Sequence, residues 1–432
     1  MKKLLSIWTG KLLYIFSNIF KIGSGSTWPG HISLMIEKNI IPILIDQLRQ
    51  GVIIVGGTNG KTTTTKMISE IMKYKNIRVI KNDSGANLIN GIASTLVNSC
   101  NWIGKINADW AIFETDEATL SILTTIFTPK IIIILNLFRD QLDRYGEIDI
   151  ITKKWQKALD DLPRSTTVIL NADDPNVALL GNDLDAKTLY FGLNEPHLYL
   201  DKVQHAADAI YCPRCGKKLI FEGFFFSHLG HWYCLNCGAK RPDPSLSQCK
   251  SPLRGIYNKY NSLAATLTAK TLNIKDKEIN KALQNFEPAF GRQENFEVDD
   301  ENVKIILSKN PAGFNESIRV LEEFPGKKKT VLIVLNDRIP DGRDVSWIWD
   351  VDFENITNYA DNLICSGDRT FDLGLRIKYA DFNINKLLID ANLNKAIKTG
   401  LKKISEGETL YVLATYSGML EVRKILIGHK LL

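Results

Sequence analysis

The sequence contains no internal repeat, no low-complexity tract and no uninterrupted apolar run of membrane-spanning length. These absences argue against a repeat array, a disordered chain and an integral membrane protein. Apolar residues make up 44% of the chain and charged residues 24%, which is ordinary for a soluble globular protein. A length of 432 residues predicts two or three domains, each large enough to bury its own core.

The N-terminal stretch 1–22 is apolar, but four lysines interrupt it and no small-residue cleavage site follows it. It is therefore neither a signal peptide nor a membrane span. Apolar residues at helical spacing predict an amphipathic helix here. These residues are Leu4, Leu5, Trp8, Leu12, Ile15, Phe16 and Ile19. We expect the helix to pack on the protein's own core; the alternative, favoured by the lysines and Trp8, is a helix lying on the membrane interface.

Charge and cysteine usage restrict the partners and the compartment. The net charge of +6 and the pI near 8.7 are mildly basic. They suit anionic substrates or a membrane surface, but are too weak to predict nucleic-acid binding. Four of the seven cysteines form two CxxC pairs, which indicates metal binding in a reducing compartment. We therefore expect a cytoplasmic protein that binds no nucleic acid.

The segment 57–62 reads GTNGKT and directly follows the apolar run 52–55. A strand, a glycine-rich loop and a helix N-terminus in this order cradle a polyphosphate with backbone N–H groups. Lys61 would neutralise the outer phosphates of ATP, and the Thr62 hydroxyl would reach Mg²⁺. The predicted ATP-binding residues of this segment are Gly57, Thr58, Asn59, Gly60, Lys61, Thr62 and Thr63.

Apolar β-branched runs alternate with helical stretches from Gly51 onward, which predicts a parallel sheet covered by helices on both faces. We expect strands at 52–55, 109–114, 131–136 and 167–171, and helices near 62–75, 87–99 and 150–161. Residues 23–30 are expected to form a loop. Helical signals resume at 258–285, and a second alternating unit begins after Arg292. Its strands are expected near 303–307, 330–335, 362–366 and 409–414.

The alternation is interrupted at 205–245 by a cysteine-rich, aromatic insertion. Two CxxC pairs eighteen residues apart have the spacing of a zinc ribbon, in which each pair places two thiolates on one tetrahedral Zn²⁺. No coordination position stays open, so the zinc is expected to be structural. Its predicted ligands are Cys212, Cys215, Cys234 and Cys237.

Carboxylates follow two further predicted strands. Glu114 ends the run 109–114, and the carboxyl ends of parallel strands face the ligand crevice, where a carboxylate can hold Mg²⁺. The segment 341–350, DGRDVSWIWD, follows another strand. A carboxylate here could hold an incoming amine and take its proton, and we choose Asp344 with Asp341 as the alternative.

In this order the motifs resemble the Mur ligase superfamily. The segment 171–175 (NADDP), the start of the helical stretch at Asn258 and Asn261, and the stretch 136–146 (NLFRDQLDRYG) belong to the match. DGRDVSWIWD is similar to the MurT-type ligase subunits within that superfamily, so the resemblance covers essentially the whole chain. Gln141 and Tyr145 stand where many relatives have histidine, and the first of those histidines serves a second metal ion in the relatives, so the resemblance leaves a second Mg²⁺ open.

The resemblance implies a central ATPase domain at 46–295 containing the ribbon, a C-terminal α/β (Rossmann-like) ligase domain at 296–432 and an N-terminal segment at 1–45. It makes Glu114 and Thr62 the Mg²⁺ ligands, and Lys61, Glu114 and Asp344 the catalytic residues. The further nucleotide contacts that it implies are Asn171, Asp173, Asp174, Asn258, Asn261 and Arg292.

The reaction implied by the resemblance is ATP-dependent amidation of the D-glutamate α-carboxyl in the lipid II stem peptide, through an acyl phosphate. The ammonia would come from a separate GatD-type glutaminase subunit, because no lone cysteine of this chain has a plausible histidine partner. Two rival functions stay open. One is an amino-acid-adding ligase of the Mur or folylpolyglutamate type; the other is a nucleotide-switched binding protein whose zinc ribbon binds nucleic acid.

Overall fold

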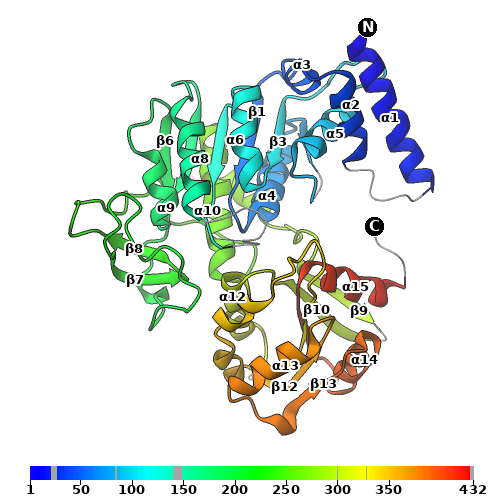
Figure 1. Cartoon of the computed structure of the whole chain (residues 1–432), viewed down its shortest axis with the longest axis vertical. Coiled ribbons are helices and arrows are strands. Elements are labelled where there is room, and N and C mark those ends of the chain that lie inside the picture. The colour runs from blue at the N-terminus through cyan, green and yellow to red at the C-terminus, as the bar shows by residue number, and fades with distance from the viewer. Residues whose placement is uncertain (21–26, 83–84, 140–147, 299, 327, 429–432) are drawn as a thin grey trace.

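The computed structural model describes residues 1–20, 27–82, 85–139, 148–298, 300–326 and 328–428. Its frame is two six-stranded sheets, one in each half of the chain, with helices on both faces of each (Figure 1). The α/β class predicted from the alternating runs is therefore confirmed. The division into domains at 45/46 and 295/296 stays a prediction, and the second of these boundaries falls inside a strand.

The first sheet is wholly parallel, in the order β2-β3-β1-β4-β5-β6. Its strands are β1 (Gly51–Gly56), β2 (Val79–Lys81), β3 (Trp110–Glu114), β4 (Ile131–Ile134), β5 (Thr167–Asn171) and β6 (Lys187–Phe191). The four strands expected in this half are thus confirmed, with small differences at their ends. The prediction missed the edge strands β2 and β6, because one is only three residues long and the other is half-exposed.

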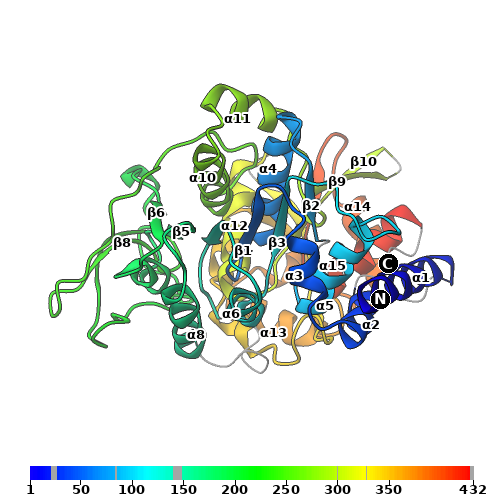
Figure 2. The same cartoon turned by 90° about the horizontal axis from the view of Figure 1, so that it is seen from above.

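Two layers of helices cover this sheet and bury its β-branched side chains in two separate cores (Figure 2). One layer contains α4 (Lys61–Tyr74), α10 (Ile256–Thr271) and α11 (Asp276–Leu283), and the other contains α5 (Ile89–Ser99), α6 (Glu117–Ile126) and α8 (Ile148–Asp160). Every residue of β4 is buried, as expected of a central strand with apolar side chains on both faces.

The N-terminal part forms α1 (Lys2–Phe20), α2 (Trp28–Ile36) and α3 (Ile40–Ile45), which lie at one edge of the first sheet. The helix predicted in residues 1–22 is confirmed over its described part. The loop predicted for 23–30 is wrong at its end, because α2 already begins at Trp28. Pro29 is tolerated in the first turn, and Gly30 lets α2 approach α5, since a Cβ at Gly30 would lie 2.0 Å from the Asn90 carbonyl oxygen.

The second sheet has the order β13-β12-β11-β14-β10-β9 and is parallel except for the β9–β10 pair. Its strands are β9 (Arg292–Val298), β10 (Glu301–Leu307), β11 (Lys329–Val334), β12 (Ala360–Ser366), β13 (Leu387–Ile389) and β14 (Thr409–Ala414). Four helices pack on it: α12 (Pro311–Glu323), α13 (Thr370–Tyr379), α14 (Leu393–Lys402) and α15 (Tyr416–Ile427). The four predicted strands are confirmed, and β9 and β13 were missed.

The cysteine-rich insertion forms a separate antiparallel hairpin, β7 (Ile220–Phe226) and β8 (Leu229–Tyr233), beyond the β6 edge of the first sheet. The ribbon and α1 therefore lie at opposite edges of the molecule in Figure 1. Among the described helices, none is long and apolar enough to cross a membrane.

Candidate functional site

The GTNGKT segment joins β1 to α4 as a tight loop, which confirms the predicted strand–loop–helix arrangement. Gly57 (φ 128°) and Gly60 (φ 91°) adopt left-handed backbone conformations that disfavour other residues. A Cβ at Gly60 would lie 2.1 Å from the side-chain oxygen of Asn261 on α10. The loop therefore needs glycine at this position both for its backbone turn and for its close approach to α10.

Asn136, which follows β4, braces the phosphate loop. The Asn59 N–H donates to the Asn136 side-chain oxygen at 2.8 Å, and the Asn136 amide donates back to the Asn59 carbonyl at 3.0 Å. The Thr58 N–H donates to the Asn136 carbonyl at 3.0 Å. The sequence shows Asn136 only as the first residue of the stretch 136–146, and the structure shows that it fixes the conformation of the phosphate loop.

Lys61 lies over the loop that it follows. Its ammonium donates to the Gly57 carbonyl and, at 3.2 Å, to the Thr58 carbonyl, and it lies 4.0 Å from the Glu117 carboxylate. Thr62 and Thr63 occupy the first turn of α4, next to the loop. The loop thus gathers a cation, two hydroxyls and a helix N-terminus in one place, as polyphosphate binding requires.

Glu114 is buried at the carboxyl end of β3. Its N–H donates to the Asn82 side chain at 2.9 Å, and the Asn82 amide donates to the Glu114 carbonyl at the same distance. Burial lowers the pKa of Arg292, and the nearby Glu114 carboxylate opposes that shift. Burial also raises the pKa of Tyr416, and Glu114 adds to this. The Glu114 carboxylate is thus close enough to Arg292 of β9 and Tyr416 of α15 to affect their ionisation, which places these residues of the C-terminal half near the end of β3.

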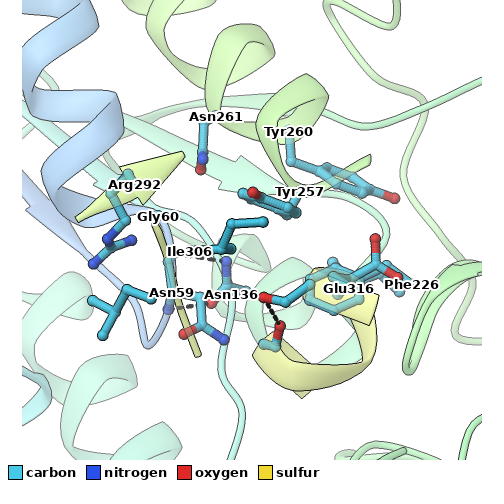
Figure 3. A pocket seen from close by; sticks show the side chains of 14 residues that line it. Asn59, Gly60, Asn136, Phe226, Tyr257, Tyr260, Asn261, Arg292, Ile306 and Glu316 are labelled. Atoms are coloured by element: carbon cyan, nitrogen blue, oxygen red, sulfur yellow. Dashed lines mark hydrogen bonds between the residues drawn. The ribbon is translucent and has the colours of Figure 1, made fainter. Parts of the chain in front are cut away.

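A hollow extends from the phosphate loop between the two halves of the chain (Figure 3). Its wall combines side chains from the loop, the ribbon hairpin, α10 and the second half of the chain. The lining residues are Asn59, Gly60, Asn136, Phe226, Leu229, Tyr257, Tyr260, Asn261, Arg292, Ile306, Leu307, Gly313, Glu316 and Ser317. Arg292 lies toward the loop in Figure 3, whereas Phe226 and Glu316 lie at the other end. The polar end suits phosphates, and the aromatic end suits a base.

The predicted nucleotide contacts are only partly brought together. Asn261 and Arg292 line the hollow. Asn258 lies beside Asn261 and accepts a hydrogen bond from its amide at 3.2 Å, while donating to the Arg254 carbonyl at 2.6 Å. Asn258 therefore fixes the loop that precedes α10.

The NADDP segment does not reach the hollow. Asp173 accepts hydrogen bonds from the Tyr260 hydroxyl (2.7 Å), the Arg241 guanidinium (2.5 Å) and the Leu193 N–H (2.8 Å). Asn171 bonds the Leu135 carbonyl, and Asp174 caps the short helix α9 (Pro175–Ala178). All three side chains are buried in internal hydrogen bonds, so a nucleotide role for them stays a prediction.

Glu316 of α12 is a site residue that motif reasoning missed. Its carboxylate lines the hollow but is almost fully buried, and Oε1 has no hydrogen-bond partner among the residues that the structure describes. Burial raises its pKa to about 7, although Arg319, 3.6 Å away, opposes the shift. No motif marks this glutamate; the only sequence signal was an acidic residue on the otherwise apolar face of a helix.

The two aspartates of the DGRDVSWIWD loop have different surroundings. Asp341 is buried, and both of its oxygens accept hydrogen bonds from Ser417, one from the N–H at 2.8 Å and one from the hydroxyl. Asp344 is exposed and accepts the Ser346 N–H at 2.8 Å through one oxygen. That hydrogen bond lowers the pKa of Asp344. Asp341 therefore anchors the start of α15, and Asp344 presents an ionised carboxylate.

The four ribbon cysteines converge in the structure. Their sulfurs all lie within 4.8 Å of one another, with Cys212–Cys237 at 3.6 Å and Cys215–Cys234 at 3.5 Å. Four thiolates on one tetrahedral Zn²⁺ would stand about 3.8 Å apart, given Zn–S bonds of about 2.3 Å. The arrangement thus fits one metal ion.

The stretch 140–147, which contains Gln141 and Tyr145, lies outside the described residues. Whether a second Mg²⁺ ion binds therefore stays open, as in the sequence analysis.

Comparisons with known proteins agree with these observations. The family model of the MurT ligase C-terminal domain matches residues 307–419, and that of the Mur ligase middle domain matches residues 55–269. The chain is 32% identical to the lipid II isoglutaminyl synthase (glutamine-hydrolyzing) subunit MurT of Streptococcus pneumoniae, over 95% of this chain and 94% of that protein. It is also 32% identical to the subunit of the same name from Staphylococcus aureus, over 86% of each.

A solved structure has the same fold. The chain resembles a pseudomurein peptide ligase type C from Methanothermus fervidus with a TM-score of 0.65 and 24% identity, covering 89% of this chain and 80% of that one. The predicted Mur-ligase-type architecture is thereby confirmed.

The ribbon supplies a first prediction. Cys234→Ser should abolish the stoichiometric zinc expected of the purified protein and lower its ATP affinity several-fold, because the same hairpin holds Phe226 and Leu229 in the wall of the hollow. Elemental analysis and calorimetric ATP titration measure the two effects. Cys249→Ser, outside the cluster, is the control and should retain the metal. Full zinc content in Cys234→Ser would refute the proposed ligand set.

Glu316 supplies a second prediction. Its pKa of about 7 lies above the ordinary value, so between about pH 4.5 and 7 the folded chain holds more protons than the unfolded chain, and stability falls as pH rises. Glu316→Gln should remove this fall and gain roughly 3 kcal/mol over the native chain at pH 8, but nothing near pH 4. Urea unfolding at both pH values measures it, with exposed Glu287→Gln as the control. Equal gains at both pH values would contradict the assignment.

Proposed function

Because the chain belongs to the MurT family of lipid II isoglutaminyl synthase subunits, we propose that it amidates the D-glutamate α-carboxyl of the lipid II stem peptide. One observation supports the proposal: Asp341 of the DGRDVSWIWD loop accepts two hydrogen bonds from Ser417, the neighbour of Tyr416, and the Glu114 carboxylate is close enough to Tyr416 to add to the rise of its pKa. This link favours a function in which the MurT-type loop and the phosphate loop act together.

The proposed chemistry has two steps. A carboxylate oxygen of the substrate attacks the γ-phosphorus of ATP, and the bond to the β-phosphate oxygen breaks, giving an acyl phosphate and ADP. Ammonia then attacks the acyl carbon, phosphate leaves, and the nitrogen gives up one proton. Lys61 and the loop N–H groups stabilise charge on the transferring phosphoryl group.

Glu114 and Thr62 fit the ligand set for Mg²⁺, a carboxylate and a hydroxyl beside the phosphate loop. When bound, Mg²⁺ would neutralise charge on the phosphate oxygens. Asp344 holds the incoming ammonia and accepts its proton. Asp344 is exposed, whereas Asp341 is buried and both of its oxygens are engaged by Ser417.

A separate glutaminase subunit of the GatD type supplies the ammonia. Nucleophilic attack requires unprotonated NH₃, which glutamine hydrolysis would deliver at neutral pH. The cysteines outside the ribbon are poor nucleophiles, because burial raises the pKa of Cys365 to about 12 and that of Cys249 to about 11. Burial also raises the pKa of Cys100. We place the complex in the cytoplasm at the inner membrane surface, where a lipid-linked substrate is found.

A nucleic-acid-binding ribbon is a weaker alternative. Arg241, one of the few basic residues around the ribbon, is bound to buried Asp173, so it is not free to contact a phosphate backbone. Lys217, Lys218 and Lys240 form no continuous basic stripe.

The function is tested by incubating the purified chain with lipid II, ATP, Mg²⁺ and a high concentration of ammonium. We expect ADP release in step with the mass decrease of the stem peptide that replacing OH by NH₂ produces. A mass gain of a whole amino acid would instead support an amino-acid-adding ligase. ATP turnover that requires nucleic acid and leaves the peptide unchanged would support the ribbon-binding alternative.

The two aspartates give a paired prediction. Asp344→Asn should lower the amidation rate at least a hundredfold without changing the unfolding temperature, since the side chain is exposed and only its charge and proton acceptor are lost. Asp341→Asn should instead destabilise the chain by about 1–3 kcal/mol, because it breaks a buried anchor to α15. Amidation kinetics and thermal unfolding separate the two roles. Normal activity in Asp344→Asn would exclude it as the ammonia-binding group.

A further inference from the structure

Helix α1 is apolar on two opposite faces. Its inner face consists of small or buried residues that let it approach α2 and α5 closely. The Ser6 hydroxyl donates to the Ser33 carbonyl at 2.9 Å, and a Cβ at Gly10 would lie 2.4 Å from the Ser33 hydroxyl and 2.8 Å from Val97. The helix does pack on the protein's own core, but the expectation is wrong about which residues do so. Six of the seven predicted apolar residues are exposed, all except Leu4, and the packing face holds Ser6, Ile7 and Gly10 instead.

The outer face of α1 is apolar too, and no other described part of the chain covers it. The exposed large apolar residues on the helix are Leu5, Trp8, Leu12, Ile15, Phe16, Ile19 and Phe20. Leu12 is 59% exposed and Ile19 69% exposed. A helix that is apolar all round is normally buried on all sides, and an apolar strip of this length on a surface marks an interaction site.

The strip continues onto the turn after α5. Trp102 and Ile103 are exposed there, and the Trp8 indole N–H donates to the Trp102 carbonyl at 2.7 Å. The Lys11 ammonium lies 5.7 Å from the centre of the Trp102 ring. We call α1 and residues 102–103 together the α1 face. Two segments almost a hundred residues apart thus form one surface.

The charge of this surface has one sign. The sequence of α1 contains Lys2, Lys3 and Lys11 but no aspartate or glutamate, and Lys105 follows the turn. A protein partner would have to supply acidic groups around a long apolar strip, whereas a bilayer containing anionic lipid offers apolar chains and negative headgroups together. Outward tryptophans with nearby lysines are typical of helices that lie in a membrane interface.

We infer that the α1 face docks the protein on a bilayer that contains anionic lipid. The helix is about 28 Å long at 1.5 Å per residue, and its packing along one side against α2 and α5 would make it lie flat on the surface and not cross it. Because its inner face is fixed to α2 and α5, the protein would be held in one orientation. The binding does not rest on the proposed amidation; only its purpose, access to a lipid-linked substrate, does.

The test is flotation of the full chain with vesicles, in the absence of lipid II and ATP. We expect binding to phosphatidylglycerol–phosphatidylcholine vesicles, at least tenfold weaker binding to pure phosphatidylcholine, and loss of affinity as salt rises. Leu12→Glu with Phe16→Glu should reduce binding at least tenfold. Phe371→Glu, which changes an even more exposed aromatic residue on α13, is the control and should bind like the native chain.

Misfolding of the variants is checked by their unfolding temperature, which should equal that of the native chain because the substituted residues are exposed. A native chain that does not float, or a double variant that floats equally well, would overturn the inference. Suppose that the native chain is a dimer that does not bind vesicles, and that the double variant is a monomer. That result would assign the α1 face to a second copy of the chain. Loss of glutaminase binding in the variant, again without vesicle binding, would assign it to that subunit.

The membrane test and the amidation test can fail independently. If the proposed function holds, the double variant should amidate lipid II in vesicles more slowly, but should process a soluble short-chain analogue at the native rate. If the double variant amidated both substrates at the rates of the native chain, the docking inference would be overturned and the amidation proposal would stay intact.

Discussion

Two adjacent buried carboxylates hold the first half of the protein together. Asp173 joins the ribbon through Arg241 and helix α10 through Tyr260, while the Asp174 carboxylate accepts the Leu137 N–H at 2.8 Å and lies 3.4 Å from His228 of the ribbon. Burial raises the pKa of Asp173, and Arg241 and the hydrogen bonds oppose this. Removing one partner would leave an uncompensated buried charge, so the network fixes where the hairpin lies.

The position of the hairpin matters because the ribbon forms part of the nucleotide hollow. Phe226 and Leu229 stand at its apolar end, facing α10, while the C-terminal half supplies Arg292 and Glu316. Other contacts join the ribbon's flanks to that half: the Arg319 guanidinium donates to the Phe225 carbonyl at 2.7 Å, and His205 lies 2.5 Å from Asp352. The insertion is therefore a structural bridge between the two α/β units as well as a metal site.

The features that could be predicted from the sequence are those with a local residue pattern: the buried β-branched strands, the glycine loop and the paired cysteines. It missed β2, β6, β9 and β13, which are the four edge strands of the two sheets and are short or only partly buried. Among site residues it missed Asn136 as the loop's brace and Glu316 as a buried acid, because both depend on which chain segments meet in space. The NADDP motif was found, yet its carboxylates point into the protein, which no spacing rule could have indicated.

The contact between Gly60 and Asn261 has a mechanical consequence. With no room for even a methyl group, the phosphate loop and α10 form one rigid body, so the distance from the loop to the Tyr257–Tyr260 end of the hollow is set before any nucleotide arrives. In this half of the protein, the length available to a bound nucleotide is therefore fixed in advance. The chain enters the other half once, through residues 284–291, so any change in the distance between the two walls of the hollow would have to bend that short segment.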